Sequence, residues 1–481
     1  MGHELSRKVY QSPRLRCRAN ITPPLPPRPL DAETCYEGGV DLLIRGGTVV
    51  TCDAGDRVAP ADVLVSGGRI AQIAPHGSIA PRGLVRVLDA TGCAVVPGLV
   101  QAHVHLCQVL FRGMADDLPL LEWLKQRIWP LEAAHDEASL TASAELGLLE
   151  MSLAGTTTVL DMGTVHGHDA VFDACLRSGL RATSGKAMMD QGDGVPAGLR
   201  ESTRESLDES DRLLRDWRGK GGGRLDYAYA PRFILSCTEE LFRGVAARSE
   251  QSGARIHTHA AEHAGEREAV RAALGVDDIA ALRAWGVTGP RTVLAHGVQL
   301  SDAEAAQLAS DRTSIVHCPS ANLKLGSGIA RLADLDSLGV QLALGCDGAP
   351  CNNNLDPWQE LRHAALLAKI TSGTTSFPAR RALRLATIDG ARALGKDALI
   401  GSLEVGKQAD IAVVRLDAPH AEPGGDVFSR LVYACKASDV EHVLVAGEFV
   451  VRHREHTRLD AGHVRSRARE LARKTAARAG L

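Results

Sequence analysis

Eight short apolar runs, separated by stretches with helical periodicity, occupy the middle of this 481-residue chain. Most of the runs contain β-branched residues, and they lie at 97–106, 157–162, 181–189, 225–232, 255–262, 291–297, 313–319 and 340–348. Helical stretches such as 136–154 and 266–285 lie between them. Strands that alternate with helices pair in parallel, and eight such units are the number that closes a (β/α)8 barrel. We therefore predict an α/β fold with a TIM-type barrel over residues 96–400.

Segments rich in β-branched residues flank this barrel on both sides. "VDLLIRGGTVVTCD" and "ADVLVSGGRIAQIAP" combine short strands with Gly-Gly pairs, a pattern typical of hairpins, and the pattern returns at 401–452. Residues 40–95 and 401–455 are therefore expected to form one small composite β-sandwich. We expect the basic segment 456–481 to be a helix, and residues 1–39, with "ITPPLPPRPL", to be a poorly ordered leader.

Charge and cysteine content limit the classes of partner. The net charge is −3 and the pI is about 6.7, so neither a nucleic acid nor a membrane surface is expected as a partner. No apolar run approaches the roughly 20 residues of a membrane span. The N-terminus lacks the apolar core of a signal peptide, although Gly2 and Ser6 match the short myristoylation pattern. Eleven scattered cysteines, among them Cys346 and Cys351, indicate reduced thiols and a cytoplasmic protein.

Histidines and carboxylates gather where the predicted strands end. His103 and His105 are alternate residues of one strand, so their side chains share a face. Barrel enzymes place their chemistry at the carboxyl ends of the strands. The residues found at those ends are His103, His105, His259, Glu262, His296, His317 and Asp347. Three histidines and one carboxylate suit zinc or ferrous iron, although His257 could replace His259, and His257 or His317 could simply cap a strand.

Four motifs make the chain resemble the amidohydrolase superfamily over residues of about 40–455: "PGLVQAHVHL", "HTHAAEHAGE", "VLAHG" and "LGCDGAPCNNNLD". With "LFRGMADDLPLLEWLKQRIWPLE" and "HCPSANLKLG", it is similar to the deaminases of 5′-deoxyadenosine, S-adenosylhomocysteine and methylthioadenosine. The resemblance implies a barrel beside a small β-sandwich. It assigns one divalent metal ion to His103, His105, His259 and Asp347, with Glu262 and His296 as catalytic partners.

These residue types fit hydrolytic deamination. A bound divalent ion lowers the pKa of water from about 15.7 to about 7, so hydroxide is available at neutral pH. Asp347 can accept the proton of that water, His296 can orient the nucleophile, and Glu262 can protonate the ring nitrogen beside the attacked carbon. The fourth strand, "LDYAYAPR", has no lysine to bridge a second ion, so one ion is expected. Lys186 is expected to be a substrate-binding or structural residue.

Two residues bear on the substrate. Glu122 aligns with a family glutamate that binds ribose hydroxyls, but it could equally be an exposed carboxylate at the start of a helix. Arg232 stands where many relatives have histidine, and "PRF" also resembles guanine deaminases. Trp123 is expected to pack rather than to stack on a base. We expect an adenosine-type nucleoside substrate and a dimer or tetramer. Guanine deamination and triazine hydrolysis are the alternatives, and a non-enzymatic assembly protein is disfavoured because all the metal ligands are present.

Overall fold

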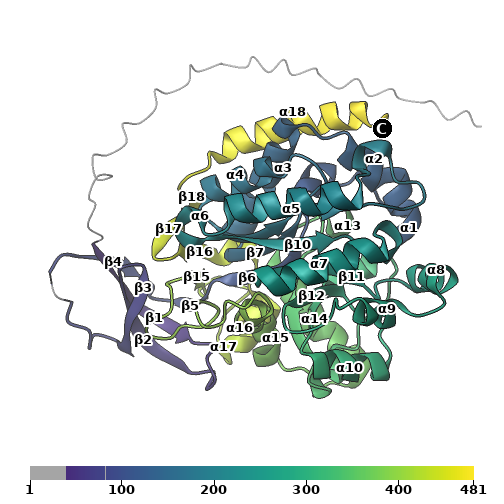
Figure 1. Cartoon of the computed structure of the whole chain (residues 1–481). Helices are drawn as coiled ribbons and strands as arrows, with labels where there is room; N and C mark the ends of the chain where they lie inside the picture. The colour runs from purple at the N-terminus through teal and green to yellow at the C-terminus, as the bar shows by residue number, and fades with distance from the viewer. Residues whose placement is uncertain (1–39, 82) are drawn as a thin grey trace, which may run out of the picture. The chain divides into compact units, whose positions relative to one another are not determined.

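Eight parallel strands form a barrel-like sheet in the computed structural model, which describes residues 40–81 and 83–481 (Figure 1). The predicted leader lies outside these residues. The strands are β6 (Leu99–Val104), β7 (Thr156–Met162), β8 (Arg181–Gly185), β10 (Leu225–Pro231), β11 (Arg255–Ala260), β12 (Thr292–His296), β13 (Ser314–His317) and β14 (Gln341–Leu344), with β9 (Ala187–Met188) beside β10. The last strand meets the first through a bridge between Val104 and Asp347. The predicted (β/α)8 fold is confirmed.

Helices connect the strands and cover the outside of this sheet (Figure 1). The longer ones are α3 (Glu137–Leu153), α4 (Asp169–Ser178), α5 (Thr203–Trp217), α7 (Glu239–Ser252), α8 (Ala264–Leu274), α9 (Asp278–Ala284), α10 (Asp302–Asp311) and α14 (Pro357–Ser372). Several begin at side chains that cap the free backbone N–H groups, as Asp136 does for α3. The helix predicted over 266–285 is two helices, because Gly275 adopts a left-handed φ of 73° and ends α8.

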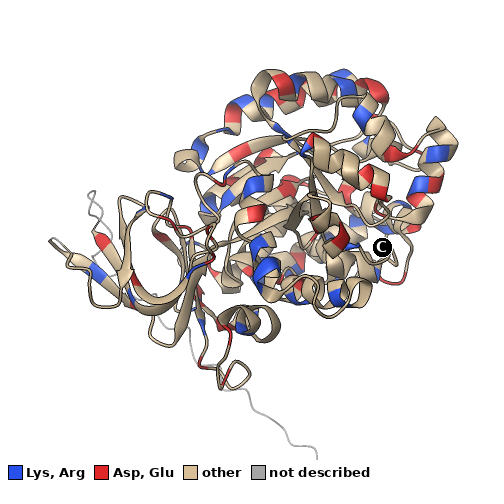
Figure 2. Cartoon of the chain, turned by 90° about the horizontal axis from the view of Figure 1, so that it is seen from below, with Lys and Arg blue, Asp and Glu red and all other residues tan. Residues whose placement is uncertain are grey.

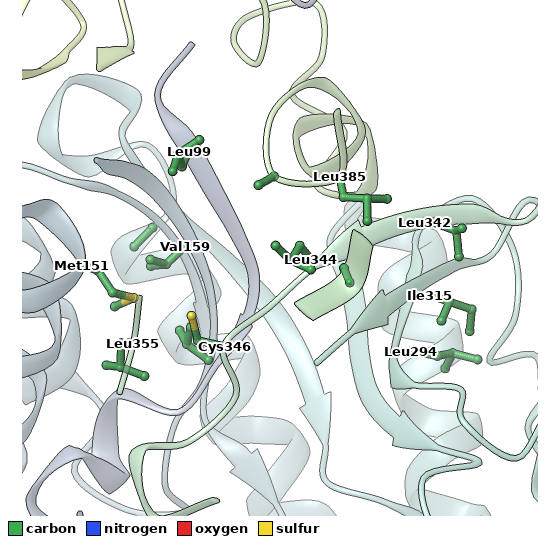
Figure 3. Close-up of a cluster of buried hydrophobic side chains, with 14 of the residues drawn as sticks. Leu99, Met151, Val159, Leu294, Ile315, Leu342, Leu344, Cys346, Leu355 and Leu385 are labelled. Carbon is green, nitrogen blue, oxygen red and sulfur yellow. The ribbon is translucent and has the colours of Figure 1, made fainter. Parts of the chain in front are cut away.

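The barrel strands divide their side chains between two hydrophobic clusters. Leu294 and Ile315 belong to a cluster that includes helix residues, whereas their neighbours Val293 and Val316 belong to a second cluster with Trp123. Figure 3 shows the first cluster, in which strand residues lie beside helix residues such as Met151 and Leu385. This alternation is what parallel strands buried on both faces require.

A second sheet combines strands from both ends of the described chain, as predicted. Its order is β18-β17-β16-β15-β5-β1-β2-β3, with β4 beside β1. The strands are β1 (Asp41–Val50), β2 (Val58–Ser66), β3 (Arg69–Pro75), β4 (Val85–Asp89), β5 (Cys93–Pro97), β15 (Ile411–Arg415), β16 (Val440–Val445), β17 (Glu448–Arg452) and β18 (Glu455–His456). The two chain ends meet where β5 pairs with β15 in antiparallel register.

The two Gly-Gly pairs near the start of this sheet behave differently. Gly67 and Gly68 have φ of 55° and 76° and form the turn between β2 and β3. Gly46 and Gly47 were expected to form a turn as well, but they lie inside β1, where the pairing register shifts between Ile44 and Gly47. Here the glycines form a β-bulge, in which Gly46 adopts a left-handed φ of 81°. A side chain at Gly47 would come within 2.7 Å of Val95.

A buried ion pair joins the barrel to the composite sheet. Arg181 at the start of β8 and Asp410 just before β15 are each 1% exposed, and two nitrogen–oxygen distances of 3.2 Å join them. Asp410 also accepts a hydrogen bond of 2.8 Å from the backbone N–H of Ala446. Residues Val40–Leu481 form one compact unit.

The C-terminal helix α18 (Ala461–Arg478) packs against α3 and the short helix η1 (Leu106–Phe111). Its Ala468 and Leu471 share a hydrophobic cluster with Leu110 and Phe111. Figure 2 shows acidic and basic residues interspersed along the outer helices. Within residues 40–81 and 83–481, no helix combines the length and the apolar content that crossing a membrane requires.

Candidate active site

Four side chains from three barrel strands converge at one end of the barrel. His103 is in β6, His105 follows it, His259 is in β11 and Asp347 follows β14. Nε2 of His105 lies 3.2 Å from Nε2 of His259. Oδ1 of Asp347 lies 3.3 Å from Nε2 of His103 and 3.4 Å from Nε2 of His105. One ion can therefore be reached from all four side chains.

In each of these histidines, the ring nitrogen that faces away from the other candidate ligands makes a hydrogen bond. Nδ1 of His105 donates to the carbonyl oxygen of Met162 (2.8 Å), and Nδ1 of His259 donates to that of Arg232 (2.7 Å). A carbonyl oxygen only accepts, so each Nε2 keeps its lone pair and faces the other ligands. Nε2 of His103 is buried and makes no hydrogen bond within the described chain. Burial lowers the pKa of His103 and His105 well below the usual value, which favours the neutral imidazoles that metal binding requires.

The two other histidines considered as ligands lie elsewhere. Nε2 of His257 lies 2.8 Å from Nδ1 of His103, so His257 supports a candidate ligand from behind. His257 lies two residues before His259 in β11, deeper in the barrel. His317 is buried at the end of β13 and does not line the cavity described below.

Glu262 and His296 lie beside the candidate ligands. Nε2 of His296 is 3.5 Å from Oε2 of Glu262 and 3.9 Å from Oδ2 of Asp347. Nδ1 of His296 donates to the side-chain oxygen of Asn322 at 2.9 Å, which fixes the ring. Burial, reinforced by the negative charge of Asp347, raises the pKa of Glu262 well above its usual range. Burial therefore favours the protonated, neutral form of the Glu262 carboxyl group.

Backbone strain concentrates at these strand ends. His296 and Asp347 have φ of 78° and 61°, and Ala261, next to Glu262, has φ of 51°. Residues other than glycine disfavour this left-handed region. Strain of this kind occurs at functional sites, where the surrounding structure maintains it. The loop with Glu262 is held by two buried carboxylates: Asp278 accepts the N–H of Ala261 at 2.6 Å, and Glu266 accepts that of Glu262 at 3.1 Å.

A cavity opens on this cluster. Polar side chains line one side of the cavity, and apolar side chains cover the other side. The lining residues are His105, Gln108, Leu120, Trp123, Leu124, Arg232, Phe233, His259, Glu262, His296, Leu325 and Asp347. The cover comes from α1 (Leu120–Trp123) and from the π-helix η2 (Leu124–Ile128), which leads into α2 (Trp129–Ala133).

Arg232 belongs to a buried polar network that no sequence pattern marks. Its guanidinium binds Glu132 through two hydrogen bonds of 2.6 and 3.2 Å, and Gln108 donates to the same carboxylate at 2.8 Å. Glu132 is the last residue of the sequence motif that ends in "WPLE", but its partner Arg232 lies 100 residues further along the chain. Glu122 is exposed on α1 and does not line the cavity, whereas its neighbour Trp123 is buried and does.

Lys186, Cys346 and Cys351, which the sequence also singled out, contact neighbouring residues outside the cavity. Lys186 is fully buried between β8 and β9 and pairs with Glu201, outside the cavity. Cys346 and Cys351 are fully buried and free, and the Sγ of Cys351 lies 3.1 Å from the carbonyl oxygen of Gly348.

Comparison with known proteins agrees with this arrangement. Residues 94–450 match the amidohydrolase family. The chain is 38% identical to the 5-methylthioadenosine/S-adenosylhomocysteine deaminase of Moorella thermoacetica, over 88% of this chain and 97% of that protein. It is also 38% identical to the 5′-deoxyadenosine deaminase of Methanothermobacter thermautotrophicus, over 90% and 98%.

Among solved structures, an adenosine deaminase from Xanthomonas campestris with bound zinc superposes with a TM-score of 0.86. The sequence identity is 34%, and the match covers 91% of this chain and 99% of the other. The match to the family spans well over half of the chain and includes every strand of the barrel. The chain therefore belongs to the amidohydrolase family, whose members are metal-dependent hydrolases.

Proposed function

We propose that the protein is a zinc-dependent deaminase that converts the 6-amino group of an adenosine-type nucleoside to a carbonyl group and releases ammonia. The observation that carries the proposal is the convergence of three histidines and Asp347 beside a buried Glu262, whose pKa is raised by burial. The relatives that deaminate 5′-modified adenosines support the substrate class. Ferrous iron has the same ligand preferences and is the alternative ion.

The residues of this chain can divide the proton transfers between them. When bound at His103, His105, His259 and Asp347, the ion would supply hydroxide near neutral pH. Oδ1 of Asp347 faces the ligand histidines and Oδ2 faces His296, so the second oxygen is free to accept the proton of the nucleophile. Glu262 is placed to give its proton to the ring nitrogen beside the carbon that loses the amino group.

The apolar cover has to move for a nucleoside to enter. The cavity measures about 30 Å³, which is room for a water molecule rather than a purine. The π-helical turn of η2 is an irregularity of the kind found at functional sites. The ribose contact expected of Glu122 stays a prediction. A cytoplasmic location and a dimeric or tetrameric state also belong to the proposal. All nine described cysteines are free, which supports a cytoplasmic location.

A substrate panel with metal analysis tests the proposal. Protein purified without added metal should contain one zinc or iron ion per chain. Ultraviolet absorbance should show the highest kcat/KM for 5′-deoxyadenosine, methylthioadenosine or S-adenosylhomocysteine, ahead of adenosine, guanine and a chlorotriazine. Two ions per chain would contradict the metal site, and a lead for guanine or the triazine would contradict the substrate class.

A further inference from the structure

A second group of metal-binding side chains lies on the composite sheet. Glu441 and His442 belong to β16, and His453 lies in the turn between β17 and β18. One ligand atom of each residue lies within 4.8 Å of the ligand atoms of the other two. Within residues 40–81 and 83–481, this is the one such group outside the candidate active site. We call these three residues the hairpin cluster.

A β-bulge lets two consecutive residues of β16 contribute to the hairpin cluster. Neighbouring residues of a regular strand point to opposite faces. The pairing of β16 with β15 shifts register between Val413 and Val414, which leaves Glu441 as the extra residue of a bulge. Bulges re-aim side chains in this way. Oε1 of Glu441 lies 3.6 Å from Nδ1 of His453, and the ring centroids of His442 and His453 are 4.6 Å apart.

The turn that carries His453 has an unfavourable backbone conformation. Arg452 pairs with Glu455, so His453 and Arg454 form a two-residue turn, with φ of 49° and 61°. Turns of this kind favour Asn and Gly, because other residues disfavour positive φ. The Arg454 side chain donates to three backbone carbonyl oxygens, which gives that residue a structural role. The His453 side chain is instead 68% exposed beside Glu441. Backbone strain of this kind occurs at functional sites.

His442 directs a lone pair toward the same turn. Its side chain is buried, and its Nδ1 accepts a hydrogen bond of 3.2 Å from the backbone N–H of His453. An imidazole nitrogen that accepts a hydrogen bond is unprotonated, and this is the form that binds a metal ion. A bound ion would replace the N–H as the partner of Nδ1. Because His453 is exposed, its N–H can then donate to water.

We propose that Glu441, His442 and His453 bind a second zinc ion, on the composite sheet. Two imidazole nitrogens and one carboxylate oxygen suit zinc, whereas calcium and magnesium take oxygen ligands. At bond lengths of about 2.0–2.2 Å, the ligand atoms of a tetrahedral zinc ion lie about 3.4 Å apart. The 3.6 Å between Glu441 and His453 is close to this separation. The ion would fasten the turn to β16, and water would complete its coordination.

Zinc binding to the full-length protein, without a histidine tag, tests the hairpin cluster. This exposed site releases its ion during dialysis, so the single ion expected of the purified protein is that of the active site. Equilibrium dialysis with added zinc should show one further ion per wild-type chain. His453→Gln and Glu441→Gln each remove a ligand and should weaken binding of this ion by at least about tenfold, since even the partners of metal ligands contribute about 10–100-fold. An excess of calcium should not displace it.

His76→Gln is the matched control for these substitutions. His76 is 56% exposed on the same sheet and lies 2.9 Å from the Asp62 carboxylate, but it belongs to no group of three ligands in the described chain. This variant should bind zinc as the wild type does. Added zinc should raise the melting temperature of the wild type and of His76→Gln, because an ion that binds only the folded state stabilises it, and should raise that of the two cluster variants less.

Three results would overturn the hairpin cluster as a zinc site. They are equal numbers of bound ions in the wild type and in either cluster variant, a loss in His76→Gln as large as that in His453→Gln, and displacement of the ion by calcium. The melting temperature without added zinc shows that each variant is folded. The test counts the difference between wild type and variants, so it does not depend on the ion or the substrate of the active site.

Discussion

Removing the charge of Asp410 should destabilise the protein without touching the candidate active site. Asp410→Asn leaves Arg181 as an uncompensated charge, because both side chains are only 1% exposed and water cannot replace the carboxylate. Breaking a buried ion pair in this way costs about 3–5 kcal/mol. Asparagine keeps an oxygen for the N–H of Ala446, so the change removes mainly charge.

The expected shift in melting temperature follows from chain length. About 440 residues at about 2.1 cal/mol/K per residue give an unfolding entropy near 0.9 kcal/mol/K, so Asp410→Asn should lower the Tm by about 3–5 °C. Scanning calorimetry of the zinc-loaded enzyme measures this shift. The double variant Arg181→Met/Asp410→Asn should recover most of the loss, because no buried charge then remains unpaired.

An exposed ion pair is the matched control for this measurement. Arg204 and Asp208 are 91% and 60% exposed, and such pairs contribute about 0–1 kcal/mol. Asp208→Asn should therefore change the Tm by about 1 °C or less. A Tm of Asp410→Asn equal to that of the wild type would refute the reasoning. A double variant no more stable than Asp410→Asn would refute it too, because Arg181 would then not be the source of the loss.

Two further predictions concern the site itself. Glu262→Gln should retain zinc but lower kcat by about 10²–10⁴-fold, since a buried amide cannot donate the proton; a normal rate with normal zinc content would return Glu262 to a structural role. His257→Leu removes the partner of His103 Nδ1 and should weaken zinc binding by about 10–100-fold in a chelator competition, whereas His317→Leu should not. Equal effects of the two histidine substitutions would argue against support of His103 by His257.

The fold was predictable because its signals are local. Most barrel strands contain β-branched residues, and most long helices follow a capping residue or end at a glycine in the chain itself. The errors arose where tertiary packing decides. Gly46 and Gly47 could end a strand or bulge within it, and only the pairing of β1 with β2 in the folded chain decides between the two.

The candidate site was predictable to the extent that its residues lie at strand ends. Position in a strand brings His103, His105, His259, His296 and Asp347 together without further information. Depth within the barrel was not predictable, because His257 and His259 share a face and differ only in how far along the strand they lie. The helical period of α1 turns Trp123 toward the cavity and leaves Glu122 exposed.

The hydrogen-bond network around Arg232 could not be predicted from the sequence, for a different reason. Glu132 and Arg232 are 100 residues apart in the chain, and neither carries a local motif for an ion pair. Gln108 follows the metal-binding motif so closely that it reads as part of a buried apolar turn. Only the folded chain shows that Gln108 and Arg232 bind the same carboxylate, that of Glu132.

Arg232 contacts both the cavity wall and a candidate metal ligand, and this limits which substitutions could change the substrate of the enzyme. Its side chain holds Glu132 in the wall of the cavity, while its carbonyl oxygen holds the ring of His259 at 2.7 Å. A substitution chosen to admit another base must leave this backbone in place, because it sets the tautomer of a candidate metal ligand. Changes of substrate at this position should therefore evolve together with changes elsewhere that restore metal retention, and a designed library should vary Glu132 and Gln108 before it varies Arg232.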